Sequence, residues 1–303
     1  MYKKLVCCVV WLAAACVWAG DAEDATVALA KRDYATALRK YSSAAAQGNP
    51  FAQFQMGNMH REGLGTPADD AQAVVWFRRS AEQGNPMAQY QLGAMYDNGL
   101  GVKRDFAEAV KWFSLSAEQG NAKAQNNLGL KYDNGEGVPR SAVEAVKWYR
   151  RAAELGHAMA QNNLAIAYEN GDGVGKDFVE AAKWYQLAAA QGYSEAQTNL
   201  GAAYSRGNGV PQSFAESLKW FRLAAEQGEV LGQFNLAAQY NAGQGMARDA
   251  VKAFVWFSLA ALQGNADANK LRASIAKRMN LEEQDAARKL LAKCQASGLK
   301  ACD

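Results

Sequence analysis

The 303-residue sequence predicts an all-α solenoid, a stack of helical hairpins that each repeat a 36-residue pattern. Two observations support this prediction. Glycine and tryptophan recur every 36 residues without an insertion, and the alternation of β-branched residues typical of strands is absent. The glycines are Gly48, Gly84, Gly120, Gly156, Gly192, Gly228 and Gly264, and the tryptophans are Trp76, Trp112, Trp148, Trp184, Trp220 and Trp256. A globular domain with a single irregular core would not be expected to repeat residues at a constant 36-residue interval.

Each repeat predicts two helices joined by a turn. In the second repeat, Ala88, Leu92 and Tyr96 share one helical face, and Gly99 supplies the left-handed residue that ends a helix. Asp105 then predicts the start of the second helix, because a side-chain oxygen at this point accepts hydrogen bonds from the first turn. The same phase holds a cap residue in the other repeats, namely Asp69, Ser141, Asp177, Ser213 and Asp249.

Two columns of small residues in the second helices allow close helix packing, and we expect the tryptophan column to fill the core beside them. The small residues are Ala73, Ala109, Ala145, Ala181, Ser217 and Ala253, with Ala81, Ala117, Ala153, Ala189, Ala225 and Ala261. One hairpin cannot bury its own apolar face, so each must stack on its neighbours, with atypical caps at both ends.

The first residues predict a leader. Lys3 and Lys4 precede an apolar stretch, and the small residues around Ala19 predict cleavage after that residue, which makes residues 1–19 a signal peptide. A second interpretation stays open, because residues 12–16 resemble a bacterial lipobox that would leave Cys16 as a lipidated N-terminus. Either interpretation predicts export, to the periplasm or the exterior in the first case and as an envelope lipoprotein in the second. Neither predicts a membrane span.

The remaining chain divides into three parts. We predict N-terminal capping helices in residues 20–48 and six repeats in residues 49–264. We predict C-terminal capping helices in residues 265–303. Outside the leader the sequence holds two cysteines, Cys294 and Cys302, for which one disulfide is the simplest expectation in an oxidising compartment. A redox-active dithiol is the alternative, although the C-x-x-C spacing is absent.

The third repeat carries a recognisable pattern in residues 124–129, Tyr132, residues 134–138 and residues 145–148. This pattern resembles the Sel1-like repeat, a relative of the tetratricopeptide repeat, over about residues 51–264. The resemblance implies a right-handed superhelix whose first helices line a concave surface, and a role as scaffold or adaptor. Exported bacterial members are associated with envelope assemblies, polysaccharide secretion and periplasmic signalling.

The resemblance therefore implies an exported, non-enzymatic scaffold or regulator of the bacterial envelope that binds a protein or peptide on its concave face. A lipid-anchored assembly factor is the alternative. Cysteine-rich secreted relatives are linked to penicillin binding or β-lactamase activity, but this sequence has no cysteine between Val17 and Lys293, so that enzyme branch matches poorly.

Little in the sequence points to catalysis or to a cofactor. His60 and His157 are the only histidines and lie nearly three repeats apart; we expect His60 to pack in a tyrosine column and His157 to be solvated. No cluster of ligand residues predicts a metal site, and the paired loop glycines predict turns because the lysine of a phosphate loop is missing. The net charge of +3 gives no basic excess, so nucleic acid is not predicted as a partner. The oligomeric state is left open.

The candidate binding residues form one column. Each lies two positions before the Leu or Met that recurs every 36 residues in the first helices. They are Phe54, Tyr90, Asn126, Asn162, Thr198 and Phe234. This column varies within a regular frame, as a recognition surface would, although a tolerant solvent-facing column would look the same. Companion positions that would widen the groove are Met87, Lys123, Met159, Glu195 and Leu231, and an adjoining amide column is expected to join helices through Asn127, Asn163, Asn199 and Asn235.

Overall fold

The computed structural model describes residues 20–302, and the described chain is helical with short turns and no strand. The leader of residues 1–19, with the cleavage site and Cys16, lies outside the described residues. A helix over residues 20–30 is followed by fifteen helices, labelled α2 to α16, that continue to the C-terminal cap. This confirms the predicted all-α repeat solenoid.

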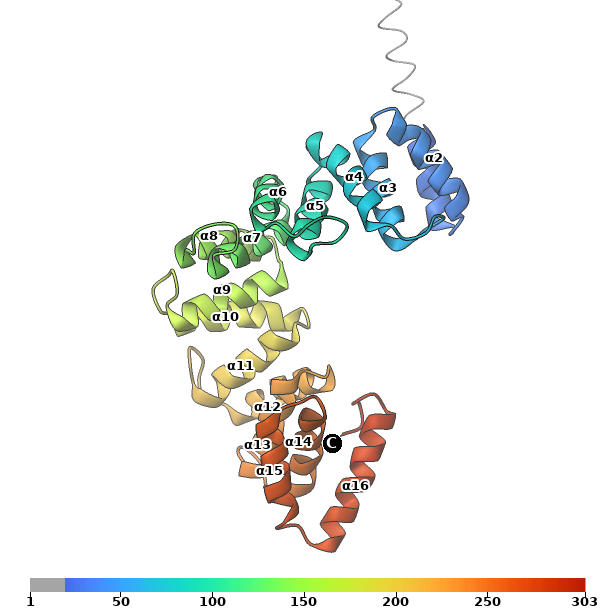
Figure 1. Cartoon of the computed structure of the whole chain (residues 1–303). Helices are drawn as coiled ribbons and strands as arrows, with labels where there is room; N and C mark the ends of the chain where they lie inside the picture. Colours follow the sequence, from blue (N-terminus) through green and yellow to red (C-terminus); the bar gives the residue numbers. More distant parts are fainter. Residues whose placement is uncertain (1–19, 303) are drawn as a thin grey trace, which may run out of the picture. The chain divides into compact units, whose positions relative to one another are not determined.

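The chain forms two compact units, the first ending at Ala152 and the second beginning at Ala153. The first contains α2 (Tyr34–Ala46), α3 (Pro50–Glu62), α4 (Asp70–Glu82), α5 (Pro86–Asn98), α6 (Phe106–Glu118) and α7 (Ala122–Asn134), and α8 (Ala142–Glu154) runs across the boundary. The second contains α9 (Ala158–Asn170), α10 (Phe178–Ala190), α11 (Ser194–Arg206), α12 (Phe214–Glu226), α13 (Val230–Ala242), α14 (Ala250–Leu262), α15 (Ala266–Ala276) and α16 (Leu281–Ala296) (Figure 1). From α2 to α7 and from α9 to α15, consecutive helices pack against each other, and α16 packs against α14.

The helix ends follow the sequence closely. Asp105 accepts hydrogen bonds from the backbone N–H groups of Ala107 and Glu108, at 2.9 and 3.1 Å, and so begins α6 as predicted. Gly99 ends α5 in the left-handed conformation, with φ of 71°, where a residue with a Cβ is strained. The predicted N-terminal half repeat is also present, because Asp33 caps α2, and Ala37 and Tyr41 are buried.

The tryptophan column is not the main core, which corrects our expectation. Trp112 and Trp256 are buried, but Trp76, Trp148, Trp184 and Trp220 are only half-buried. The next residue in each helix fills the core instead, with exposures of 0 to 5 %: Phe77, Phe113, Tyr149, Tyr185, Phe221 and Phe257. Successive helix residues are rotated by about 100°, so only one of two adjacent aromatic columns can point directly inward. The tryptophans pack at the margin, where Arg79 covers the Trp76 ring at 4.6 Å.

A column of small residues in the first helices leaves room for these core aromatics. A Cβ added to Gly93 would lie 2.7 Å from the Phe113 ring, which is closer than real Cβ atoms approach other atoms. A Cβ added to Gly129 would lie 2.5 Å from the Tyr149 ring. The glycines therefore let a full aromatic ring lie directly against the backbone of the neighbouring helix.

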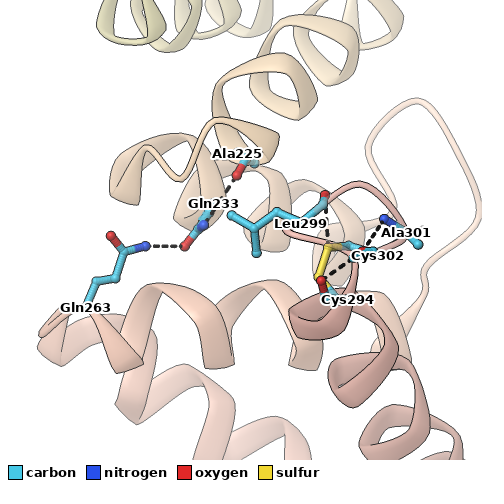
Figure 2. The surroundings of a disulfide bond; sticks show 8 residues. Ala225, Gln233, Gln263, Cys294, Leu299, Ala301 and Cys302 are labelled. Atoms are coloured by element: carbon cyan, nitrogen blue, oxygen red, sulfur yellow. Dashed lines mark hydrogen bonds between the residues drawn. A yellow bond between two sulfur atoms is a disulfide. The ribbon is translucent and has the colours of Figure 1, made fainter.

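The C-terminal cap is closed by a disulfide between Cys294 and Cys302, both of which are buried (Figure 2). Cys294 lies in α16, and the turn that follows carries Leu299, whose side chain packs on the apolar core of the second unit. Asn280 and Glu283 form a reciprocal capping box at the start of α16. Within residues 20–302, no helix combines the length and apolar composition that crossing a bilayer requires.

Candidate binding surface

We use the term first-helix face for the side chains that α3, α5 and α7 expose in the first unit, and that α9, α11 and α13 expose in the second. These are the first helices of the six repeats. The predicted binding column runs along these helices, and its members fall into two groups, of which only the half-buried one belongs to this face.

The aromatic members of the column are half-buried. Phe54, Tyr90 and Phe234 each keep part of their ring accessible. The covered part of each ring packs on a core aromatic of the following second helix, with centroid distances of 5.8 Å for Phe54 to Phe77 and 6.0 Å for Tyr90 to Phe113. Burial raises the pKa of the Tyr90 phenol, which therefore stays neutral at physiological pH. These rings present a fixed apolar surface.

The polar members are buried and hydrogen-bonded within the protein. Asn126, Asn162 and Thr198 are 1, 4 and 5 % exposed. The Asn162 side-chain oxygen accepts a hydrogen bond from the Asn199 amide at 3.0 Å, which joins α9 to α11 as predicted for the amide column. The Thr198 hydroxyl lies 2.8 Å from the Glu229 carboxylate. Of the six members of the column, Phe54, Tyr90 and Phe234 are therefore the ones whose side chains keep accessible surface.

The first helices also carry exposed apolar side chains. Met87 and Leu231, two of the predicted companion residues, are 45 and 56 % exposed, and Met159 is 40 % exposed. Phe51 is 43 % exposed and was not among the predicted residues, although it occupies the same repeat position as Met87. Removing apolar side chains this exposed from water lowers the free energy, so contact with another apolar surface would be favourable.

A ladder of glutamines holds the first helices in place behind this face. Gln89 is 3 % exposed; its side-chain amide donates to the Ala81 carbonyl oxygen at 3.2 Å, and its oxygen accepts from Gln119 at 2.7 Å. The same pair recurs as Gln53 with Gln83, Gln161 with Gln191, Gln197 with Gln227, and Gln233 with Gln263, the last of which is drawn in Figure 2. In the third repeat, Leu155 stands at the position of the second glutamine, and the buried Gln125 oxygen has no hydrogen-bond partner. Sequence reasoning missed this ladder, although its 36-residue spacing was visible.

Both histidines are half-buried, and one of them caps a helix. His157 is half-buried and caps α9, since its Nδ1 accepts the Ala160 backbone N–H at 3.2 Å, so the expectation of a solvated side chain was wrong. His60 is half-buried in the tyrosine column as expected, and its Nδ1 is buried without a hydrogen bond. Among residues 20–302, no three His, Cys, Asp or Glu side chains are arranged to hold a metal ion.

The buried cation of the first unit is neutralised. Lys131 is 6 % exposed and occupies the repeat position of Met59 and Met95. Its ammonium group pairs with the carboxylates of Glu136, at 2.6 Å, and Asp97. The bond with Lys131 also lowers the pKa of the Glu136 carboxyl group. The buried ammonium group is therefore paired within the protein.

Comparison with known families gives a consistent result. A model of the Sel1 repeat matches six consecutive segments of the chain, residues 50–85, 86–121, 122–157, 158–193, 194–229 and 230–265. A comparison with curated proteins found no match.

Two of the solved structures that resemble the chain are similar to it over most of its length. One is c5321, a protective antigen present in uropathogenic Escherichia coli strains and displaying an SLR fold, with 38 % identity and a TM-score of 0.76 over 89 % of this chain. This chain covers 58 % of the length of that antigen. The other is a Sel1 repeat protein from Oxalobacter formigenes, with 33 % identity and a TM-score of 0.73, covering 79 % of this chain and 96 % of that one.

Proposed function

Because the chain belongs to the Sel1 repeat family, whose members generally mediate protein–protein interactions, we propose that it is an exported, non-enzymatic adaptor or regulator of the bacterial envelope. It binds a partner protein or peptide on the first-helix face. The observation that carries this proposal is the set of half-buried aromatic rings together with the exposed Phe51, Met87 and Leu231 of the same helices.

The chemistry of this face suits a protein surface better than a small molecule. Its apolar side chains are spread along successive helices, and the rings are held by core contacts, so a partner would not have to order them. An extended or helical peptide that crosses several repeats would cover such a strip.

The binding half of the proposal is tested with the double variant Phe51→Ser/Met87→Ser. Both side chains are exposed, so the fold should tolerate the change. The matched control is Val75→Ser/Leu115→Ser, which removes equally exposed apolar side chains, at 40 and 45 %, from the second helices α4 and α6. A partner is first identified by cross-linking in the native envelope fraction and then purified for binding measurements.

We expect the purified partner to bind the wild type and the control equally, and to bind Phe51→Ser/Met87→Ser at least about tenfold more weakly, as loss of anchor residues commonly causes. Equal binding by all three proteins would place the interaction outside the first-helix face of the first unit.

The export half is tested by fractionation and by mass spectrometry of the mature N-terminus. Cleavage after Ala19 gives a chain that begins at Gly20. The lipid-anchored alternative gives a lipidated Cys16, and its palmitate labelling disappears in Cys16→Ser. A full-length chain retained in the cytoplasm would contradict both forms of the proposal.

A further inference from the structure

Two adjacent pockets lie among α14, α15 and α16, the last three helices of the second unit (Figure 1). Both are lined by Met279, which is buried between α15 and α16 in sequence. The first pocket has a volume of about 190 Å³ and a mainly polar lining, and we call it the arginine pocket: Arg248, Ala250, Ile275, Arg278, Met279 and Glu283. The second has a volume of about 160 Å³ and a mainly apolar lining, and we call it the apolar pocket: Phe254, Ala276, Met279, Gln284, Ala287 and Arg288.

The arginine pocket offers positive charge to a ligand. Arg248 and Arg278 are both exposed, and within the part of the chain that the structure describes neither guanidinium group forms an ion pair. Arg278 donates from Nε to the Ser274 carbonyl oxygen at 3.3 Å, which leaves its two terminal nitrogens for another acceptor. Glu283 also lines the pocket, but its carboxylate already accepts the Asn280 backbone N–H at 2.9 Å. Two guanidinium groups beside one engaged carboxylate favour the binding of a further carboxylate.

The apolar pocket has room for one side chain. Ala287 and Met279 are buried, and Phe254 is half-buried, so part of its ring stays accessible. The Gln284 amide donates to the carbonyl oxygens of Ala276 and Met279, at 3.3 and 3.0 Å, and so is used within the protein. An apolar cavity of about 150 Å³ holds a ring of the size of benzene. The pocket therefore suits a single Leu, Ile, Val or Phe side chain.

The two pockets are offset by one helical turn. On α14, Ala250 lines the arginine pocket and Phe254 the apolar pocket, and on α16 the same step separates Glu283 from Ala287. Four residues of a helix rise by about 6 Å, which is close to the distance between the carboxylate of a C-terminal residue and the end of its own side chain.

The offset also favours a chain terminus over an acidic side chain. Successive side chains of an extended peptide point to opposite sides. An Asp or Glu next to the apolar residue would therefore direct its carboxylate away from the arginine pocket, whereas the terminal carboxylate of the apolar residue itself stays within reach of both arginines.

We propose that these pockets bind the C-terminal residue of a partner polypeptide. Arg248 and Arg278 hold its terminal carboxylate, and the apolar pocket holds its Leu, Ile, Val or Phe side chain. No residue of the first-helix face takes part, so this site goes beyond the proposed function and does not depend on it.

The test begins with a library of random octapeptides that are anchored through their N-termini and selected on the full mature chain. The selected peptides are then synthesised as free acids and as C-terminal amides, and their binding is measured by fluorescence anisotropy. Arg248→Gln/Arg278→Gln changes two exposed side chains, so the fold should tolerate it. The control Lys277→Gln/Lys300→Gln removes the same charge from two exposed lysines that line neither pocket.

We expect the selected peptides to end in Leu, Ile, Val or Phe, and their amides to bind at least about tenfold more weakly than the free acids. Arg248→Gln/Arg278→Gln should weaken binding of the free acids by a similar factor and change binding of the amides by less than about twofold. The control should bind both forms as the wild type does.

The apolar pocket is tested from both sides of the contact. A peptide whose terminal residue is replaced by glycine should bind the wild type at least about tenfold more weakly. Ala276→Leu places a larger side chain in the lining and should weaken binding of the original peptide by about tenfold. If this variant does not fold, the glycine peptide still tests the pocket without a change in the protein.

The proposal is wrong if no peptide is selected, if the selected peptides share no apolar terminal residue, or if the amides bind as tightly as the free acids. Unchanged binding of the free acids by Arg248→Gln/Arg278→Gln would contradict it as well. Phe51→Ser/Met87→Ser should bind the selected peptides as the wild type does. Weaker binding by that variant would place the peptides on the first-helix face and would remove the C-terminal site while keeping the proposed function.

Discussion

The glutamine ladder gives a sharp prediction, because one repeat already lacks one of its members. We expect Gln119→Leu to lower the free energy of unfolding by about 1–2 kcal/mol, within the cost of about 1–3 kcal/mol for a buried polar group left without a hydrogen bond. The Gln89 oxygen would lose the donor that now lies 2.7 Å away, and Gln89 is too buried for water to replace it readily. The third repeat, with Leu155 and an unpaired Gln125 oxygen, shows that the fold survives this state.

The size of the effect is limited by what Gln119 itself contributes. Its side chain is exposed, so leucine creates no cavity there, and its second hydrogen bond, to the Leu115 carbonyl oxygen at 3.2 Å, is also exposed. The matched control is Gln72→Leu, which replaces an exposed glutamine in α4 whose side chain supports no buried group. We expect the control to change stability by less than about 0.5 kcal/mol, as surface substitutions usually do.

Urea unfolding followed by circular dichroism measures the total change, and hydrogen exchange of the α5 amides measures it locally, because repeat arrays do not always unfold in one step. The reasoning would be refuted if Gln119→Leu and Gln72→Leu had the same unfolding free energy and left α5 equally protected. In that case water or a rearranged side chain would be satisfying the Gln89 oxygen.

Three further predictions follow from the core and the cap. Tyr149→Ala should cost about 3–5 kcal/mol in urea unfolding, whereas Trp148→Ala should cost only about 1–2 kcal/mol, since Tyr149 is buried and Trp148 is half-buried; an equal cost would contradict the assignment of the core column. Burial and the hydrogen bond to the Asp133 carboxylate, at 2.7 Å, raise the pKa of the Tyr149 phenol, so its stabilisation is complete below the unfolded pKa of about 10 and decreases as pH rises above it. Tyr149→Phe should therefore lose less stability than wild type between pH 9 and pH 11, and an unchanged slope would show that other groups control it. Replacing Cys294 and Cys302 with alanine should cost about 2–3 kcal/mol and should increase hydrogen exchange in α16 before it does so elsewhere; a uniform increase would show that the cap is not a local element.

The repeat itself could be predicted from the sequence because each element has a local signal. Asp105 and Gly99 mark the beginning and the end of helices through their own side-chain or backbone preferences, and these preferences do not depend on distant residues. The depth of a side chain has no such signal. Trp148 and Tyr149 both belong to perfect 36-residue columns, and periodicity alone cannot tell which of two neighbouring aromatics points inward.

The binding column shows the same limit for polar residues. Asn126 and Asn162 suggested a solvated surface because amides are usually exposed, but the protein supplies hydrogen bonds within the interior and buries both. Phe54 and Tyr90, from the same column, keep part of their rings accessible. The column was identified by its variation within a regular frame, and variation at a position does not indicate how deeply each side chain is buried.

Residues that recur in every repeat must serve the frame that the repeats share, so specific recognition has to come from positions where one repeat differs from the others. Several such differences have physical consequences in the structure. Lys131, at the repeat position of Met59 and Met95, is buried and paired with two carboxylates, and Leu155 in a glutamine column accompanies an unpaired amide oxygen.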